Sequence, residues 1–323
     1  MKSLILATLL FCVGCTTPSY QTVDGSMLGT TYHIVAETDL SSKEIYKKMQ
    51  EINSEAIASM SIFDSSSLLN RINRNETDLV DIHIARNIEI ASKVNTLTQR
   101  YDITVKPLVE AYGFAGKNRE VKPNIDSLME FVGFNKFRIS NNRIIKSDPR
   151  LQIDLNSIAK GYVVDMIAEW LDEQGSQNYI VEVGGEIRAK GVNARGTVWR
   201  VGVDSPFDNN QTPGQYQQHV VQISGAALAT SGNYRRFYYN DNGERISHTI
   251  NPQTGRSQTT SLLSATVIAP RCATADALAT AFMASGEEEA IALAERLRDS
   301  VSVYFVLAPE SGKTEYREFS TLK

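Results

Sequence analysis

A series of short apolar segments in the second half of the chain limits it to folds built on large antiparallel sheets. Beyond Gly175, the segments YIVEV, TVWRVGV, HVVQIS, LLSATVIA and VSVYFVLA follow one another, and RRFYYNDNGERISHTI predicts a hairpin that turns at residues 241–243. Helical patterns lie before and between these strands. Strands in runs with helices between them predict an α+β fold, with layered, largely antiparallel sheets and packed helices.

Two of the helical patterns carry boundary signals. The segment SSKEIYKKMQEINSEAIASM begins with a capping box formed by Ser41 and Glu44, and its apolar residues fall on one helix face. Residues 154–175 predict a second amphipathic helix, whose start Asn156 or Ser157 can cap. Each of the two patterns thus predicts a helix with one apolar face.

The first fifteen residues, MKSLILATLLFCVGC, predict a secretion signal rather than part of the fold. Their apolar run is shorter than the roughly 20 residues that a spanning helix needs. Gly14 and Cys15 at the end of the run resemble a bacterial lipobox, although Cys12 stands where leucine is usual. Residues 1–15 therefore predict a lipoprotein signal with lipidation at Cys15; an ordinary signal peptide with a chance cysteine is the alternative.

Removal of the signal would leave a chain that depends on its own core. Residues 16–26 predict a polar tether, and residues 27–323 a single domain without an internal linker. With Cys15 acylated, Cys272 is the one remaining cysteine, so we expect no internal disulfide. The net charge of −4 and the lack of a basic run argue against nucleic acid as a partner.

A carboxylate and a hydroxyl stand four residues apart in the small-residue segment ATADALATAF. On a helix, Asp276 and Thr280 would lie on one face and could bind one cation. Hard oxygen ligands suit Mg²⁺ or Ca²⁺ better than zinc. The structural alternative is that Asp276 caps the helix and Thr280 bonds back to its own backbone.

Three further motifs hold residues suited to a binding site. Lys160 falls in the first turn of the 154–175 helix, where N–H groups attract anions, although a plain capped helix is the alternative. Gly184 and Gly185 follow a strand and permit either close approach to a ligand or a tight turn. His248 can act as a base near neutral pH, or it can be structural. The chain has no Gly-x-Gly-x-x-Gly or P-loop motif.

Taken together and in order, the motifs resemble those of the ApbE family of FAD:protein FMN transferases, also called flavin transferases. The resemblance covers about residues 24–310, so it implies the fold of that family for nearly all of the predicted domain. The motifs that carry it are GSMLGTTY, FDSSSLLNRIN, YDITVKPLVEAYGF, IDLNSIAKGY, VEVGGEIRAKG, ATSGNYRRFY, SHTINPQTGR and ATADALATAF.

The resemblance implies a role for individual residues. Ser157, Asp276 and Thr280 match metal ligands, and His248 matches the position of the catalytic base. Some relatives carry a second carboxylate where this chain has Ala279, so its ion is expected to take more ligands from water or phosphate. The positions that match the FAD site are Met27, Phe63, Tyr112, Gly113, Phe114, Asp154, Lys160 and Ile250.

The implied reaction is the Mg²⁺-dependent transfer of FMN from FAD to a threonine hydroxyl of a target protein, with release of AMP. FAD hydrolysis to FMN and AMP, a non-catalytic FAD carrier and a scaffold lipoprotein are the alternatives. Family targets carry a threonine-containing flavinylation motif and are often subunits of membrane redox complexes. With Cys15 lipidated, the protein is expected to be anchored to a bacterial membrane, facing the periplasm or the cell exterior.

Overall fold

The fold is described for residues 19–114, 123–207, 216–234, 237–258 and 260–322 by a computed structural model. Its helices are α1 (Ser42–Met60), α2 (Leu68–Asn73), α3 (Ile82–Leu97), α4 (Lys106–Ala111), α5 (Ile125–Met129), α6 (Ala159–Glu173), α7 (Cys272–Ser285) and α8 (Glu287–Leu297). Its strands are β1 (Tyr20–Met27), β2 (Thr30–Glu37), β3 (Phe137–Ser140), β4 (Arg143–Lys146), β5 (Tyr179–Val183), β6 (Glu186–Lys190), β7 (Trp199–Asp204), β8 (Gln217–Ile223), β9 (Ala226–Gly232), β10 (Phe237–Tyr239), β11 (Arg245–Ser247), β12 (Ile250–Asn251), β13 (Arg256–Ser257), β14 (Leu262–Ala269), β15 (Ser302–Leu307) and β16 (Arg317–Ser320).

One large sheet organises the molecule. Its strands run in the order β1-β2-β5-β6-β9-β14-β15-β16, and each neighbouring pair is antiparallel. Hairpins β3-β4, β7-β8, β10-β11 and β12-β13 form small two-stranded sheets around it. The predicted α+β fold with largely antiparallel sheets is therefore confirmed.

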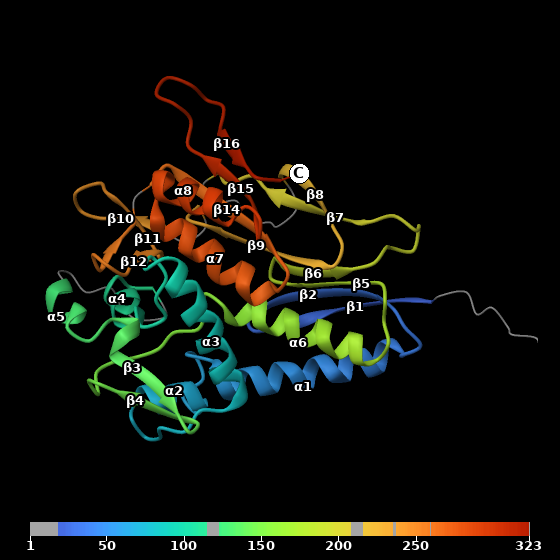
Figure 1. Cartoon of the computed structure of the whole chain (residues 1–323), viewed down its shortest axis with the longest axis horizontal. Helices are drawn as coiled ribbons and strands as arrows, with labels where there is room; N and C mark the ends of the chain where they lie inside the picture. Colours follow the sequence, from blue (N-terminus) through green and yellow to red (C-terminus); the bar gives the residue numbers. More distant parts are fainter. Residues whose placement is uncertain (1–18, 115–122, 208–215, 235–236, 259, 323) are drawn as a thin grey trace, which may run out of the picture.

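Helices cover one face of this sheet, and the β7-β8 hairpin covers the other. Figure 1 shows α1, α6 and α7 side by side across the helical face. In β15, Val303, Phe305 and Leu307 belong to the core beneath the helices, whereas Tyr304 and Val306 join a second core with β7 and β8. Alternate residues of a strand point to opposite faces, so the nearly continuous apolar run of β15 fills both cores.

α7 is the most deeply buried helix of this arrangement. In it only Thr274 and Thr280 are not fully buried. Its small side chains let neighbouring backbones approach closely, which explains the run of alanines in its sequence. Among the residues that the structure describes, no helix combines the length and apolar character needed to cross a membrane.

The first strand corrects the predicted extent of the tether. Residues 20–26, predicted to be part of a polar tether, belong to β1 and pair with β2 from Tyr20–Glu37 to Met27–Thr30. Val23 and Met27 are buried, while most of the intervening side chains are exposed or half-buried. The polar residues on the exposed side of this edge strand conceal its alternation, which is why the sequence suggested a tether.

The two predicted helix starts had different outcomes. The capping box of α1 is confirmed, because Ser41 Oγ accepts from the Glu44 N–H at 3.3 Å and Glu44 Oε2 accepts from the Ser41 N–H at 2.8 Å. The predicted cap of α6 is wrong, since the helix begins after Ile158 without a side-chain cap. Ser157 instead bonds to a distant tyrosine.

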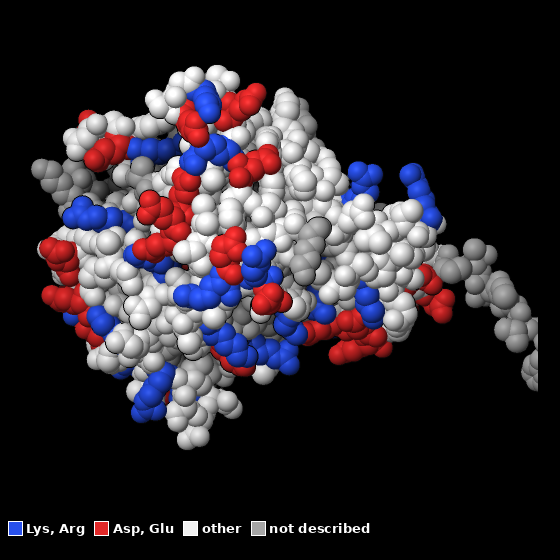
Figure 2. Space-filling model, turned by 45° about the horizontal axis from the view of Figure 1, so that its top comes forward, with Lys and Arg blue, Asp and Glu red and all other residues white. Residues whose placement is uncertain are grey.

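Charged side chains are interspersed on the molecular face shown in Figure 2. Basic and acidic groups alternate across it rather than forming a field of one sign. Ion pairs such as Arg271–Glu169 and Arg298–Glu295 accompany this pattern. Charge is therefore locally balanced on the face in view.

Candidate functional site

α6 and α7 meet at a glycine, and this contact sets the position of Asp276. A Cβ atom added to Gly161 would lie 2.5 Å from the Cys272 carbonyl oxygen, so only glycine fits at this crossing. The Gly161 N–H donates to Asp276 Oδ2 at 3.0 Å. Asp276 lies in the second turn of α7, so the alternative in which it caps the helix is excluded.

The N-terminus of α7 is capped by α6 instead of by its own N-cap residue. Asp165 accepts hydrogen bonds from the N–H groups of Cys272 and Ala273, each at 3.0 Å. Arg188 Nη1 on β6 donates to the same carboxylate at 2.8 Å. This buried network fixes the depth at which α7 enters the core, and with it the height of Asp276 above the sheet.

Lys160 lies between two buried carboxyl groups. Its ammonium forms an ion pair with Glu186 at the start of β6, and the charge of Asp276 also acts on it. Burial alone would lower the pKa of Lys160, but the attraction of Glu186 and Asp276 raises it above its usual value. Burial raises the pKa of Asp276, against the opposing effects of Lys160 and the Gly161 N–H.

Glu186 pairs with Lys160 despite the cost of burying its carboxyl group. Burial raises the pKa of Glu186 to about 7, and the contacting ammonium opposes that rise. The site thus places two buried carboxyl groups, those of Glu186 and Asp276, beside one ammonium.

Hydroxyl groups from two loops, from α7 and from β9 lie near this cluster. Ser157 Oγ lies 3.0 Å from the hydroxyl of Tyr101, which is itself buried. Burial and the charges of Asp276 and Asp154 raise the pKa of Tyr101, so the tyrosine links Ser157 to the Asp276 neighbourhood. Thr280 Oγ1 lies 3.4 Å from Ser231 Oγ on β9. The hydroxyl of Thr280 thus faces the sheet, one turn beyond Asp276.

This donor set fits a hard divalent cation. The three side chains predicted as ligands supply a carboxylate and two hydroxyls, and Mg²⁺ prefers oxygen ligands supplemented by water or phosphate. Two buried carboxyl groups beside a single ammonium provide the electrostatic complement. Within the described residues, no group of three His, Cys, Asp or Glu side chains could hold a metal ion. A cation here would therefore depend on hydroxyls and non-protein ligands.

The start of α6 offers fewer N–H groups to an anion than the sequence suggested. The Ala159 N–H donates to the Leu155 carbonyl at 2.8 Å, and the Gly161 N–H is taken by Asp276. The side chain of Lys160 is about one-third exposed. Recognition of an anion at this point would rest mainly on the Lys160 ammonium.

Aromatic rings and His248 form a second cluster. The Phe114 ring lies 5.7 Å from the ring of Tyr238 and 6.2 Å, edge-on, from the ring of His248. The Tyr238 hydroxyl donates to the Tyr112 carbonyl at 3.1 Å. Ile250 packs with Leu108 and Val132, beside the partly buried Tyr112. The structure thus brings together the Tyr112–Phe114 turn, His248 and Ile250.

Hydrogen bonds hold the segment that carries His248. Thr249 Oγ1 donates to Asn233 Oδ1 at 2.7 Å, and the Ser247 N–H donates to Ser257 Oγ at 2.9 Å. Ser257 belongs to β13 and Asn233 directly follows β9, so both partners lie outside the His248 loop itself. The residues on both sides of His248 are therefore held in place, which restrains the backbone that carries the imidazole.

The remaining predicted residues occupy separate positions. Asp154 is buried and accepts from the Asn156 N–H at 2.8 Å, close enough to Tyr101 to influence its pKa. Met27 is buried at the end of β1, and Phe63 is 70% exposed on the loop after α1. No hydrogen bond or ring contact within the described chain joins Met27 or Phe63 to either cluster. Cys15 lies outside the described residues.

The glycine pair forms a tight turn between β5 and β6. Gly184 and Gly185 have φ values of +60° and +98°, and the Gly185 N–H donates to Glu182 Oε1 at 2.6 Å. Residues other than glycine rarely adopt these positive φ values. The structural alternative for this motif is therefore correct, and its consequence is the fixed position of Glu186 directly after the turn.

Sequence reasoning missed three residues of the site. Tyr101 and Glu186 lie inside the motifs YDITVKPLVEAYGF and VEVGGEIRAKG, and Ser231 lies inside ATSGNYRRFY. Each was present in a quoted motif, but no spacing rule connects them to Asp276. Only an expected pairing of buried charges could have pointed to Glu186.

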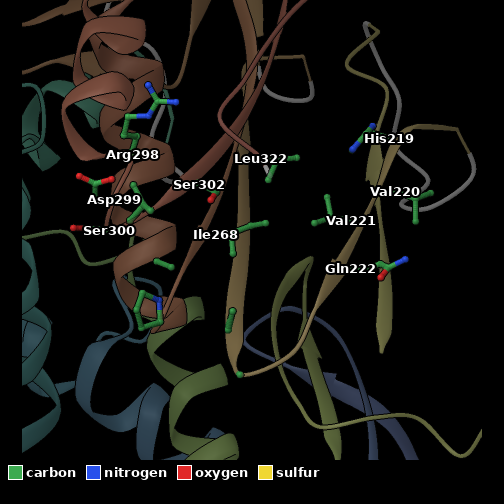
Figure 3. A pocket seen from close by; sticks show the side chains of 15 residues that line it. His219, Val220, Val221, Gln222, Ile268, Arg298, Asp299, Ser300, Ser302 and Leu322 are labelled. Atoms are coloured by element: carbon green, nitrogen blue, oxygen red, sulfur yellow. The ribbon is translucent and has the colours of Figure 1, made fainter. Parts of the chain in front are cut away.

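A cavity of about 600 Å³ lies away from these clusters, near the β7-β8 hairpin. Figure 3 shows Val220, Val221 and Gln222 on one side of it and Arg298, Asp299 and Ser300 on the other, with Ile268 and Leu322 between them. None of the predicted site residues lines this cavity. This cavity and the chemically suited residues are thus at different places in the molecule.

The chain is similar to known proteins over most of its length. A relative from Vibrio cholerae, named FAD:protein FMN transferase, is 35% identical and the match covers 98% of this chain and 96% of that protein. A Haemophilus influenzae relative of the same name is 34% identical, with 90% and 87% covered. The solved structure of the flavin transferase ApbE from Vibrio cholerae superposes with a TM-score of 0.82 at 33% identity, covering 94% of this chain and 97% of that one. The profile described as the ApbE family matches residues 28–305. The chain therefore belongs to the ApbE family.

Proposed function

We propose that this protein transfers FMN from FAD to a threonine hydroxyl of a target protein, in a Mg²⁺-dependent reaction that releases AMP. The observation that carries the proposal is the buried cluster of Asp276, Lys160 and Glu186, flanked by the hydroxyls of Ser157 and Thr280. A site with one ammonium and an excess carboxylate suits a metal ion together with a pyrophosphate. Relatives that share nearly the whole chain bear the name FAD:protein FMN transferase.

The cluster would supply the electrostatic part of the reaction. Ser157, Asp276 and Thr280 would hold Mg²⁺, whose bound charge stabilises negative charge on phosphoryl oxygens. The Lys160 ammonium would orient the pyrophosphate by pairing with one of its oxygens. Phosphoryl transfer needs positioning and charge stabilisation more than covalent participation of the protein. The buried setting of these groups strengthens both effects.

The aromatic cluster would supply the flavin surface and the base. Phe114 and Tyr112, with Ile250, offer an apolar wall for a flavin ring next to His248. His248 would accept the proton of the threonine hydroxyl. The threonine oxygen then forms a bond to the FMN phosphorus, the bond from that phosphorus to the bridging oxygen breaks, and AMP leaves with the electron pair.

The proposal includes a location and a partner. Cys15 would be lipidated, which anchors the protein to a bacterial membrane with its domain in the periplasm or outside the cell. The target would be a subunit of a membrane redox complex that carries a threonine-containing flavinylation motif. Lipid-anchored enzyme and membrane-bound target would then meet on the same surface.

Incubation of the purified protein with FAD, Mg²⁺ and a threonine-motif target tests the function. We expect AMP release and a fluorescent target band on a denaturing gel, both lost with chelator or in the Asp276→Ala variant. Asp299→Asn, at the distant cavity, is the matched control and should keep full activity. AMP without a labelled band would identify FAD hydrolysis instead, and FAD binding without AMP would identify a carrier.

A further inference from the structure

We propose that Glu186 is a positioning residue, which occupies the Lys160 ammonium and so leaves the Asp276 carboxylate available to a divalent cation. This inference rests on the proposed metal-dependent function. It concerns a residue that no sequence pattern assigned to the site. Its evidence lies in the geometry of the β5-β6 turn, the first turn of α6 and the buried pair between them.

Glu186 is held in place by its backbone. It follows the Gly184–Gly185 turn directly, and a Cβ on Gly184 would lie 2.7 Å from Thr30 Cγ2 on β2. Its side chain is 4% exposed and contacts the Lys160 ammonium. The turn therefore presents a carboxylate to α6 at a fixed point, with little freedom to move away.

Lys160 could serve either of two carboxylates. It is the second residue of α6 and adjoins Gly161, whose N–H already bonds to Asp276. The charges of both Glu186 and Asp276 act on its ammonium. Without the Glu186 charge, the strongest remaining attraction on Lys160 within the described site is Asp276. An ammonium and a metal ion would then compete for the same carboxylate.

The Lys160–Glu186 pair carries a free-energy cost that a residue serving only the stability of the fold would avoid. Glu186 Oε2 is buried and has no hydrogen-bond partner among the described residues. A buried carboxylate oxygen without a partner is unfavourable, and replacing a buried ion pair by apolar side chains is often neutral or stabilising. Retention of this pair beside Asp276 thus points to a role in the site rather than in the stability of the fold.

Mn²⁺ binding to the full-length protein, measured by the electron paramagnetic resonance signal of free Mn²⁺ without FAD, tests the role. In Glu186→Gln we expect affinity to fall roughly 10–100-fold, the usual effect of losing a residue that supports a metal ligand. In the double variant Lys160→Met/Glu186→Gln no ammonium competes, so affinity should return to within about threefold of wild type. High Mg²⁺ should also restore the transfer rate of Glu186→Gln.

A second ion pair between the same two elements provides the matched control. Asp172 of α6 and Lys190 of β6 lie 2.9 Å apart, away from Asp276. Asp172→Asn removes one carboxylate from the α6–β6 contact and should leave Mn²⁺ affinity unchanged. A loss of affinity in this control equal to that in Glu186→Gln would overturn the proposal, because any α6–β6 pair would then matter equally.

The remaining outcomes separate this role from the proposed function. A wild type that binds Mn²⁺ and releases AMP, with an unchanged Glu186→Gln affinity, overturns the role of Glu186 alone. A double variant as weak as Glu186→Gln does the same, since Glu186 would then act independently of Lys160. A wild type that binds no Mn²⁺ and releases no AMP overturns both proposals. If Glu186→Gln is unfolded by circular dichroism, the double variant decides, because it leaves neither charge unpaired.

Discussion

Asp276 illustrates how a single residue acquires its chemistry from distant partners. Its carboxylate accepts a hydrogen bond from the Gly161 N–H and is attracted by the Lys160 ammonium. It is buried in an otherwise apolar helix. Each partner lies more than a hundred positions away in the sequence. The same aspartate on an exposed helix would be an ordinary surface residue, so its role follows from burial and charge pairing rather than from its type.

His248 is predicted to act in the chemical step and not in FAD binding. The His248→Ala variant should lose roughly 10²–10⁴-fold in transfer rate, the usual contribution of general-base catalysis. FAD affinity should change little, because Lys160 and the proposed metal ligands form a separate cluster. FAD titration and AMP release on one preparation measure the two effects. Loss of affinity together with rate would make His248 a binding residue instead.

At the scale of elements, the buried cap between α6 and α7 should dominate local stability. Asp165 is 1% exposed, accepts two N–H groups of α7 and pairs with Arg188. Replacing it by alanine removes one partner of a buried ion pair, which typically costs about 3–5 kcal/mol. We expect a loss of about 3 kcal/mol in the free energy of unfolding, measured by urea denaturation.

A partly exposed pair on the same helix provides the comparison for this prediction. Asp172 pairs with Lys190, and both side chains are about one-third exposed. Asp172→Asn should therefore cost less than about 1 kcal/mol. Equal effects of the two substitutions would show that Asp165 is not a special anchor for α7.

The pair between α8 and β16 predicts a pH dependence of stability. Glu287 accepts from Arg317 at 2.7 and 2.8 Å and from Ser261, and these bonds lower the pKa of Glu287 below its ordinary value of 4.5. A carboxyl group whose pKa is depressed by folding stabilises above its unfolded pKa and loses that contribution as the pH falls through its folded pKa.

The stability difference between wild type and Glu287→Gln should accordingly shrink on acidification. We expect up to about 1 kcal/mol at neutral pH, as for a partly exposed ion pair, and a progressively smaller difference as the pH falls below 4.5 toward the lowered pKa of Glu287. Urea unfolding across this range measures it, with Glu295→Gln on the exposed side of α8 as control. A difference that grows toward low pH would contradict the assigned role of the Arg317 bonds.

At the scale of the whole molecule, the start of the fold and the candidate site lie at opposite ends of the same strands. Tyr20 pairs with Glu37, whereas Met27 and the β5-β6 turn with Glu186 lie at the other end of the β1-β2-β5 register. Eight strand residues span about 26 Å. In Figure 1 the chain enters β1 far from β12 and α4. An anchor at the N-terminus would thus leave the site turned away from it.

Lipidation at Cys15 is therefore predicted to affect location and not catalysis. Cys15→Ser should move the protein out of the detergent phase, because stable anchoring depends on the acyl chains. AMP release per enzyme with a soluble target should remain unchanged, since β1 begins at the opposite end of its sheet strands from the β5-β6 turn and Glu186. Detergent partitioning and AMP release of the same preparation provide the test. Unchanged partitioning of the variant would contradict the lipoprotein assignment.

Local patterns in the sequence were sufficient for the fold class and for much of the element order. Short apolar segments predicted the strands of the second half, four-residue spacing predicted α1 and α6, and the Ser41–Glu44 capping box predicted the start of α1. These features depend on neighbouring residues, whose spacing directly fixes which face is buried. The ordered motifs also carried the resemblance to the ApbE family, because each motif keeps its residues within one short segment.

Only the tertiary structure decided how those residues combine. The register of β1, the cap of α7 by Asp165, the crossing at Gly161 and the pairing of Glu186 with Lys160 all join segments that are distant in the sequence. Burial and electrostatic coupling depend on three-dimensional proximity, and no local spacing encodes it. The sequence by itself thus determined which groups were available, and packing determined that Glu186 pairs with the ammonium next to the buried Asp276.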